Sequence, residues 1–428
     1  MRHILKLALA CVLLVSSVHA EQRAIVRALG GQVTLDGACR PLGCNVVAGL
    51  EDPLSQVFLI TFPDSLSMDE LFAGLSRVTG IVNFEPDRVA KLSNNRPVIP
   101  EALYNSERTI HFGIDVRKGY AVQPAVQIVR LAQAQTTFSV AGGATIAVID
   151  TGVDPDHPVL RRVLLPGYDF TRGGTSSGSE MSDVNQSTAA VVDGVAPRHV
   201  NDSTAAVVDQ STAAVVDNRD HAAFGHGTMV AGIIHLAAPR STILPLKAFR
   251  ADGSGYTSDI LRAVYRAVRH NARVINMSFS MDSASPELER AVKHATSAGS
   301  ICVASAGNRG QAISVYPAAW SSVIGVASTT NNDRRSTFSN YGSSLVWLAA
   351  PGEGVITTYP FGSYAAAWGT SFSTPLVSGT VALLLDIRCD LTLSQVSAAL
   401  GEALPLGPEL GRGRLDVFRA LEAARNIR

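Results

Sequence analysis

The chain has 428 residues, of which 46% are hydrophobic, and its 36 basic residues balance 36 acidic ones. This length allows one large domain and a smaller one. A formal net charge of zero gives no sign of a nucleic-acid-binding surface or an electrostatic membrane anchor, so we expect no nucleic-acid partner. No long apolar run follows the N-terminal leader, so we expect no integral membrane segment in the mature chain.

The leader, residues 1–20, has the three parts of a secretory signal peptide. A basic start with Arg2 and Lys6 precedes an apolar core from Leu7 to Val15, and small residues end at Ala20. We predict cleavage after Ala20 and a secreted protein, either periplasmic or extracellular.

Four cysteines remain after removal of the leader. Cys39 and Cys44 could close a small disulfide loop in an oxidising compartment. The pairing of Cys302 and Cys389 stays open, since buried free thiols are an equal alternative.

Residues 21–95 are expected to form a small α+β domain. The apolar run VFLITF at 57–62 predicts a strand, and IVNFEPDRVAKL further on predicts another. Between them SMDELFAGLSRVTG predicts a helix whose Ser67 and Glu70 form a capping box. A polar, proline-containing stretch at 96–120 then predicts a linker.

From residue 121 onward, apolar strands alternate with helices. The predicted strands are GATIAVID, RVINMSFS, ICVASAGN and SVIGVAS. Continuous apolar strands separated by helices indicate an α/β fold with a parallel sheet covered on both faces. Ligands bind beyond the carboxyl ends of such strands. Asp150, Ser278 and Asn308 each follow a predicted strand, so we expect them to face one crevice.

A surface insertion is predicted at 175–220. The heptapeptide STAAVVD occurs there three times, at 187–193, 203–209 and 211–217. Too little sequence separates the copies to build a repeat architecture. We interpret the segment as a flexible loop whose Ala and Val runs could pair as sheet edges.

His226 stands between two glycines in FGHGTMVAG, at the start of an apolar run that predicts a buried helix. An imidazole base acts on a nucleophile and is itself held by a third group. The best nucleophile candidate is Ser371 in GTSFSTPLVSG, which we place at the N-terminus of a helix that includes residues 376–385. There Pro375 would fall in the first turn, and the helix dipole favours developing negative charge.

Taken singly, each residue also fits a structural role. Ser371 could cap its helix, Asp150 could cap the turn after its strand, and Asn308 could occupy a left-handed turn. The set favours chemistry, because Asp, His, Asn and Ser occur in that order, each in a turn of small residues after an apolar element.

Eight motifs together are similar to those of the subtilisin-like serine proteases, the subtilases: VIDTGVD, GHGTMVAG, VINMSFS, ASAGN, YPAAWSSVIGVAS, TFSNYGSSLVWLAAPG, GTSFSTPLVSG and GRGRLDVFRALEAA. The resemblance covers residues 121–428. It implies a serine endopeptidase that works through an acyl-enzyme, with Asp150 orienting the imidazole, His226 as general base and acid, and Ser371 as nucleophile. Asn308 and the Ser371 backbone N–H would bind the oxyanion.

The resemblance also implies how a substrate binds. The peptide would add as a strand between Gly253–Thr257 and Ser278–Ser280. The pocket for the residue before the cut would be walled by Ser278–Ser280 and Ala304–Gly307, with Val315 where many relatives have a floor glycine. The implied substrate-binding residues are therefore Gly253, Gly255, Ser278, Phe279, Ser280, Gly307 and Val315. No acidic residue occurs in these stretches, so we expect small to medium apolar side chains at that position.

Relatives are made as zymogens, so the resemblance implies that residues 21–95 act as an inhibitory and folding-chaperone propeptide, cut off between about residues 95 and 120. The expected partners are protein or peptide substrates and this propeptide. We expect no cofactor; calcium stabilises many relatives, but no Asp-rich spacing here assigns a metal site.

Two other functions stay open. A transpeptidase, ligase or cyclase of this fold would use the same acyl-enzyme and let an amine intercept it. A catalytically silent binding relative would usually lack a triad member, and here all four positions are intact.

Overall fold

The computed structural model describes residues 22–90, 100–172, 178–183, 198–200, 203–207 and 223–427. The predicted signal peptide and the first and third copies of STAAVVD lie outside these ranges. The described chain divides into two compact units. Unit 1 contains residues 22–49 and 56–86, and unit 2 contains residues 50–55 and everything described from residue 87 onward.

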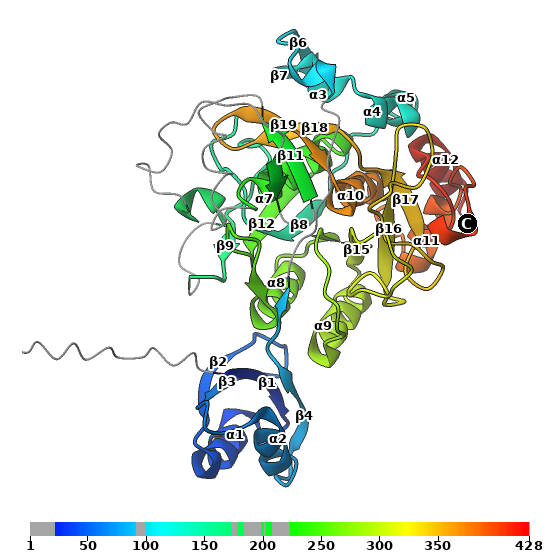
Figure 1. Cartoon of the computed structure of the whole chain (residues 1–428). Coiled ribbons are helices and arrows are strands. Elements are labelled where there is room, and N and C mark those ends of the chain that lie inside the picture. The colour runs from blue at the N-terminus through cyan, green and yellow to red at the C-terminus, as the bar shows by residue number, and fades with distance from the viewer. Residues whose placement is uncertain are drawn as a thin grey trace, which may run out of the picture. The chain divides into compact units, whose positions relative to one another are not determined.

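Unit 1 is an α+β sandwich. Its antiparallel sheet has the order β2-β3-β1-β4, and both helices lie on one face of it (Figure 1). The elements are β1 Gln22–Ala28, α1 Gly31–Cys39, η1 Arg40–Leu42, β2 Asn45–Gly49, β3 Val57–Phe62, α2 Met68–Leu75 and β4 Ile81–Pro86. The helices and sheet enclose one apolar core.

The predicted strand, helix and strand of unit 1 are confirmed. Ser67 Oγ accepts a hydrogen bond from the Glu70 N–H, and the Glu70 carboxylate accepts one from the Ser67 N–H, so the capping box is present. A disulfide joins Cys39 and Cys44. The preceding β1–α1–β2 segment was not predicted, and the unit ends at Pro86 rather than near residue 95.

Unit 2 is built on a seven-stranded parallel sheet with the order β17-β16-β15-β14-β8-β12-β9. Its strands are β8 Thr145–Asp150, β9 Tyr168–Asp169, β12 Thr242–Lys247, β14 Val274–Met277, β15 Ile301–Ser305, β16 Val323–Thr329 and β17 Leu348–Pro351. The central strands are buried along their length, as expected for a sheet covered on both faces. The predicted fold class is confirmed.

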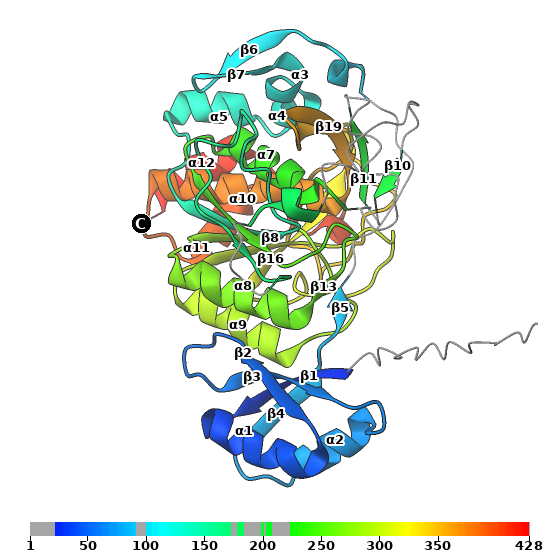
Figure 2. The ribbon, with the colours of Figure 1, turned by 90° about the vertical axis from the view of Figure 1, so that its left-hand side faces the viewer.

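Helices cover both faces of this sheet. Figure 2 shows α8 (Thr257–Arg269) and α9 (Pro286–Ser297) on one side, with α7 (His226–Ala237) and α10 (Thr370–Ile387) on the other. Within the described ranges one helix, α10, is long and apolar enough to cross a membrane, but 89% of its most apolar window is buried in the protein. Because it is sandwiched between α7 and the sheet, α10 is a core helix that is apolar on all sides.

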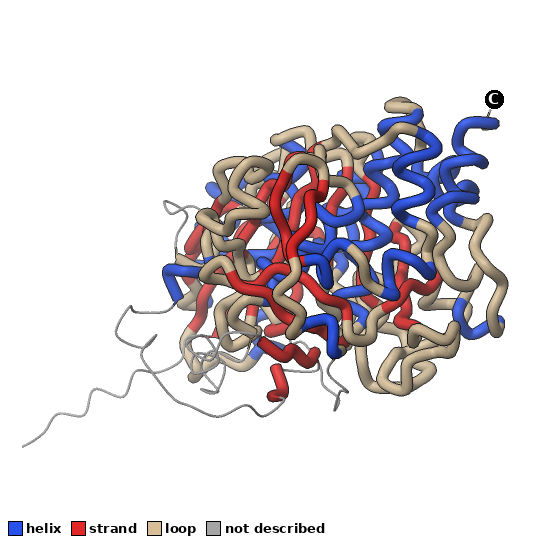
Figure 3. Tube along the Cα trace, turned by 90° about the horizontal axis from the view of Figure 1, so that it is seen from above, coloured by secondary structure: helices blue, strands red, loops and turns tan. Residues whose placement is uncertain are grey.

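The remaining helices flank this core. Helices α11 and α12 pack together on the side of unit 2 where the C-terminus lies (Figure 3). Their bounds and those of the shorter helices are α3 Lys118–Ala121, α4 Pro124–Ile128, α5 Leu131–Phe138, α11 Leu393–Leu400, α12 Val417–Asn426, η2 Glu101–Leu103, η3 Glu180–Asp183 and η5 Pro408–Leu410.

Three small sheets complete unit 2. They have the orders β10-β11-β19-β18, β13-β5 and β6-β7. Their strands are β5 Val89–Ala90, β6 Arg108–His111, β7 Ile114–Arg117, β10 Arg198–Val200, β11 Ser203–Val207, β13 Gly255–Tyr256, β18 Val355–Tyr359 and β19 Ser363–Trp368.

Two predicted segments differ from expectation. Residues 100–120 of the predicted linker are folded, since they form η2, the β6–β7 hairpin and α3, and they bury Leu103, Val116 and Tyr120. Residues 178–180, placed by us in the surface insertion, are buried as well. The middle copy of STAAVVD supplies β11, which pairs antiparallel with β19, in line with the edge pairing expected of it.

The contact between α7 and α10 generates a stability prediction. A Cβ added at Gly379 of α10 would lie 2.4 Å from the Cβ of Ala237 on α7. We expect Gly379→Val to lower the free energy of unfolding by about 1–3 kcal/mol through overpacking. Gly37→Val in α1 has no neighbouring atom within 4 Å and should change it by less than about 1 kcal/mol.

Denaturant titrations measure both variants in a Ser371→Ala background, which removes the nucleophile that the sequence predicts. Tryptophan fluorescence reports on unit 2, because Trp320, Trp347 and Trp368 all lie there, and far-UV circular dichroism reports on the whole chain. Equal stability of the Gly379→Val variant and its parent would contradict a close packing of α7 on α10.

Candidate active site

Three adjacent strands end at one edge of the parallel sheet. Asp150 is the last residue of β8, Ser278 follows β14 directly, and Asn308 lies just beyond β15. Since β15, β14 and β8 are neighbours in the sheet, their carboxyl ends are adjacent. The three residues therefore lie at the same edge of the sheet.

A short hydrogen bond joins β8 to α7. Nδ1 of His226, the first residue of α7, lies 2.7 Å from Oδ1 of Asp150, and both side chains are buried. Because the ring proton faces the carboxylate, the neutral imidazole carries its lone pair on Nε2. That Nε2 is buried and has no hydrogen-bond partner among the described residues. The pair therefore presents an oriented base.

Ser371 is the second residue of α10, and its Oγ donates a hydrogen bond to the Ser278 carbonyl at 2.9 Å. The next side chain, Phe372, contacts the imidazole of His226, with the ring centroids 5.3 Å apart. The N-terminus of α10 thus lies beside the N-terminus of α7.

Pro375 lies deeper in α10 than we predicted. The helix begins at Thr370, so the proline is its sixth residue and not part of the first turn. Having no N–H, it cannot donate to the carbonyl of Ser371 one turn earlier. Ser278 Oγ donates to that carbonyl instead, at 2.8 Å. An intrahelical bond is therefore replaced by a bond from the end of β14.

Behind Ser278 the hydrogen bonds continue into the core. Asn276 Nδ2 donates to Ser278 Oγ at 3.0 Å, and Ser378 Oγ donates to Asn276 Oδ1 at 2.8 Å. These bonds attach the first half of α10 to β14. Sequence reasoning missed Asn276 and Ser378; the proline four residues after Ser371 was the available signal that some other group must satisfy the Ser371 carbonyl.

Thr370 orients the side-chain amide of Asn308. Asn308 Oδ1 accepts hydrogen bonds from the Thr370 N–H at 2.8 Å and the Thr370 hydroxyl at 2.7 Å. With its oxygen held, the amide directs its NH₂ group to the other side. Thr370 Oγ1 also accepts from the Gly307 N–H at 3.1 Å. Thr370 was not among the predicted site residues.

The predicted pocket residues Ser280, Gly307 and Val315 come together. Gly307 has a φ of +86°, and a Cβ added there would lie 3.2 Å from Ser280 Oγ and 3.6 Å from Val315 Cγ2. The Phe279 side chain is buried and packs on Phe249, away from this group, with the ring centroids 5.0 Å apart.

The edge strand β13 accepts an extended partner within unit 2. Gly255 and Tyr256 pair antiparallel with Ala90 and Val89 of β5, and the Thr257 N–H donates to the Arg88 carbonyl at 3.1 Å. Gly253 precedes this edge in a tight turn, with a φ of +81°. The segment that we expected to take up a substrate strand therefore carries one from the chain itself.

No metal site emerges from the described ranges, which contain no group of three or more His, Cys, Asp or Glu side chains placed to hold an ion. Burial in β15 raises the pKa of Cys302 to about 12, so this thiol is not a nucleophile at neutral pH.

A double-mutant cycle tests whether Ser278 supplies the hydrogen bond to the Ser371 carbonyl that Pro375 cannot make. Ser278→Ala leaves the Ser371 carbonyl without its donor and should cost about 1–3 kcal/mol of unfolding free energy. Pro375→Ala restores an N–H that can donate to the same carbonyl, so the cost of Ser278→Ala should be smaller in that background. Denaturant titrations of the four chains, all with Ser371→Ala, measure the coupling; strict additivity would contradict this role of Ser278.

Comparisons with known proteins show the family of this chain. The model of the subtilase family matches residues 141–413. Thermitase of Thermoactinomyces vulgaris is 32% identical over 65% of this chain and 89% of its own length. The thermophilic serine proteinase of Bacillus sp. (strain AK1) is 33% identical over 70% of this chain and 66% of its own. An intracellular serine protease of Paenibacillus polymyxa is 30% identical over 66% and 82%.

Among solved structures, fervidolysin from Fervidobacterium pennivorans, described as a keratinolytic enzyme related to subtilisin, is similar in fold. The two align with a TM-score of 0.70 at 21% identity, over 94% of this chain and 61% of fervidolysin. This likeness extends the agreement in fold beyond the segment that the family model matches. The chain belongs to the subtilase family and is a serine endopeptidase.

Proposed function

We propose that this chain is an exported zymogen of a serine endopeptidase in which Asp150, His226 and Ser371 form the catalytic triad and Asn308 binds the oxyanion. The buried 2.7 Å bond between Asp150 and His226 carries the proposal, since it leaves Nε2 of the imidazole unpartnered among the described residues. Beside that ring begins the helix that bears Ser371.

In the proposed reaction the Ser371 hydroxyl leaves the Ser278 carbonyl and gives its proton to His226 Nε2 as Oγ attacks the peptide carbonyl. Asp150 stabilises the imidazolium that forms. His226 then donates this proton to the leaving amine, and an ester links Ser371 to the acyl group. Water, deprotonated by His226, attacks the ester and releases the acid.

The oxyanion formed in each attack needs donors that are already in place. Asn308 Nδ2 and the Ser371 backbone N–H are the proposed donors. The two bonds from Thr370 to Asn308 Oδ1 support this role, because they fix the amide before substrate binds. The first turn of α10 adds a helix dipole that favours negative charge at the same place.

The proposed substrate is a protein or peptide in extended form along β13 and Ser278–Ser280. Strand addition of this kind recognises the backbone of the substrate more than its side chains. Ser280, Gly307 and Val315 would line the pocket for the residue before the cut, and the Val315 side chain would limit its depth. We therefore propose small to medium apolar residues there.

Unit 1 is proposed to be the inhibitory propeptide. The pairing of β5 with β13 supports this, because the chain that follows unit 1 occupies the edge proposed for the substrate. Residues 100–120 are folded into unit 2 and bury Leu103, Val116 and Tyr120, so cleavage there would cut through structure. We place the processing bond within 91–99, which lies outside the described residues.

Export is proposed from the leader sequence alone. Family membership does not fix the compartment, since one relative is named an intracellular serine protease. The basic start, apolar core and small residues before Ala20 are the features that support secretion.

Labelling with a serine-directed phosphonate, combined with casein hydrolysis, tests the proposed chemistry. The processed protein should be labelled at Ser371 and cleave casein. Ser371→Ala and His226→Ala should lose about 10⁶ in turnover, and Asn308→Ala about 10²–10³, as the equivalent changes do in subtilisin. Because Ser373 is a buried serine on the same helix, Ser373→Ala is a matched control that should still be labelled at Ser371.

Other outcomes identify the alternatives. Labelling at Ser371 with transfer of the acyl group to an added amine, and little hydrolysis, would indicate a transpeptidase, ligase or cyclase. Neither labelling nor turnover in a correctly folded, processed chain would indicate a silent binding relative.

Cleavage of a peptide library tests the pocket. The wild type should cut after small and medium apolar residues, and Val315→Gly should shift cleavage toward larger apolar residues because it removes the side chain beside Gly307. Mass spectrometry of the products reads both preferences. Cleavage mainly after Arg or Lys would overturn the proposed specificity.

A further inference from the structure

The carboxyl group of Glu180 is completely buried beside the segments that carry Asp150 and His226. Glu180, in η3, has none of its surface exposed. Its Oε2 accepts hydrogen bonds from the Gly225 N–H at 2.8 Å and from the Thr151 hydroxyl at 3.1 Å. Its Oε1 accepts one from the Thr228 hydroxyl. Sequence reasoning placed this residue in a surface insertion and gave it no role.

The three donors flank the two residues of the buried pair. Thr151 directly follows Asp150, Gly225 directly precedes His226, and Thr228 lies two residues beyond it. One side chain therefore binds both the segment that carries the carboxylate and the segment that carries the imidazole. A shift of either segment would lengthen the bond between Asp150 and His226.

Both threonine hydroxyls are already acceptors. Thr151 Oγ1 accepts from the Gly227 N–H at 3.0 Å, and Thr228 Oγ1 accepts from the Asp154 N–H at 2.8 Å. Each hydroxyl proton is thus available to Glu180, and with Gly225 the carboxylate form receives three hydrogen bonds. Burial raises the pKa of Glu180 to about 8, while the bonds from Thr228 and Gly225 and the charge of Lys247 act to lower it.

Backbone contacts make the arrangement tight. A Cβ added at Gly152 would lie 2.6 Å from the Glu180 nitrogen, and one added at Gly227 would lie 1.9 Å from the Gly152 oxygen. The segments around Asp150, Glu180 and His226 therefore touch through their main chains. In so compact a place the carboxyl group has little freedom to move.

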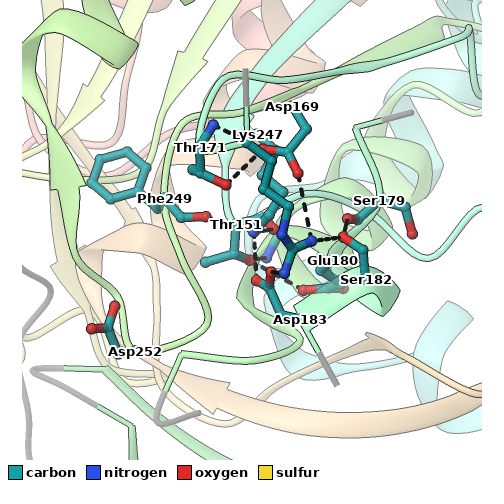
Figure 4. A network of polar contacts seen from close by, with 12 residues as sticks. Thr151, Asp169, Thr171, Ser179, Glu180, Ser182, Asp183, Lys247, Phe249 and Asp252 are labelled. Atoms are coloured by element: carbon teal, nitrogen blue, oxygen red, sulfur yellow. Dashed lines mark hydrogen bonds and ion pairs between the residues drawn. The ribbon is translucent and has the colours of Figure 1, made fainter. Parts of the chain in front are cut away.

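A second buried side chain supports the same segment. Lys247, at the end of β12, donates to the Thr151 carbonyl at 2.7 Å, to Asp183 Oδ2 at 2.6 Å and to the Phe249 carbonyl at 2.7 Å. Figure 4 shows Lys247, Asp183 and Glu180 gathered beside Thr151. Lys247 thus fixes Thr151 and η3 to the sheet.

We propose that Glu180 is a positioning residue that holds Asp150 and His226 in register by binding the segments next to both. The inference rests on the proposed triad. The insertion leaves after η3 and returns before Ala223, so the bond from Gly225 to Glu180 closes its base.

Kinetics of Glu180 variants test the proposal. Glu180→Ala should lower kcat about 10–100-fold with KM within about twofold, as expected when reacting groups are misplaced but substrate still binds. Glu180→Gln keeps the shape and one acceptor and should retain more activity than Glu180→Ala.

The matched control is Glu287→Gln. Glu287 is also fully buried and pairs with Arg290 on α9, so its loss should lower the melting temperature without a selective fall in kcat. If Glu180→Ala and Glu180→Gln change only the melting temperature, as this control does, the proposal is wrong.

A signal independent of turnover completes the test. In the unprocessed Ser371→Ala chain, the Nδ1 proton that His226 shares with Asp150 should give a far-downfield proton resonance. We expect Glu180→Ala and Glu180→Gln to weaken or shift this resonance and Glu287→Gln to leave it in place. An unchanged resonance in folded Glu180 variants would overturn the inference, whereas a wild type without phosphonate labelling would overturn the proposed triad instead.

Discussion

The hydrogen bond between Asp150 and His226 is the contact on which the rest of the site depends. Both partners are buried, so water cannot substitute for either if they separate, and an unpaired buried carboxylate is costly. Each partner belongs to an element that is held on two sides. Asp150 ends β8, which lies between β14 and β12 in the sheet. His226 begins α7, which packs between α10 and the β18–β19 hairpin.

Around Ser371, the hydrogen bonds that stabilise the helix involve the same residues as the proposed reaction. Pro375 leaves the Ser371 carbonyl without its helical donor, and Ser278 supplies one from the end of β14. The Ser278 carbonyl in turn accepts the Ser371 hydroxyl. Ser278, which the sequence analysis expected to bind substrate, therefore also fixes the helix that presents the proposed nucleophile. The sheet edge and the helix start cannot shift independently.

Sequence patterns predicted what depends on local periodicity. Apolar runs that end in a polar residue located Asp150, Ser278 and Asn308, and strand adjacency in a parallel sheet brought them together. The supporting bonds were beyond such reasoning, because they join residues far apart in the chain: Ser278 and Ser371 are 93 positions apart, and Glu180 and Thr228 are 48. Composition also misled, since polar residues around Glu180 suggested a surface although the structure buries it.

The insertion lies between Asp150 and His226 in the sequence, and buried hydrogen bonds hold the described residues at its two ends. It interrupts the chain between Asp150 and His226, whose Oδ1 and Nδ1 lie 2.7 Å apart. Its middle repeat pairs with β19, the strand that leads into the helix of Ser371. The described strand of the insertion is therefore attached to β19, next to the helix that bears Ser371. The two ends of the insertion are attached to the core as well. The buried bonds of Glu180 to Gly225, and of Lys247 to Asp183, fix those ends where the loop begins and returns.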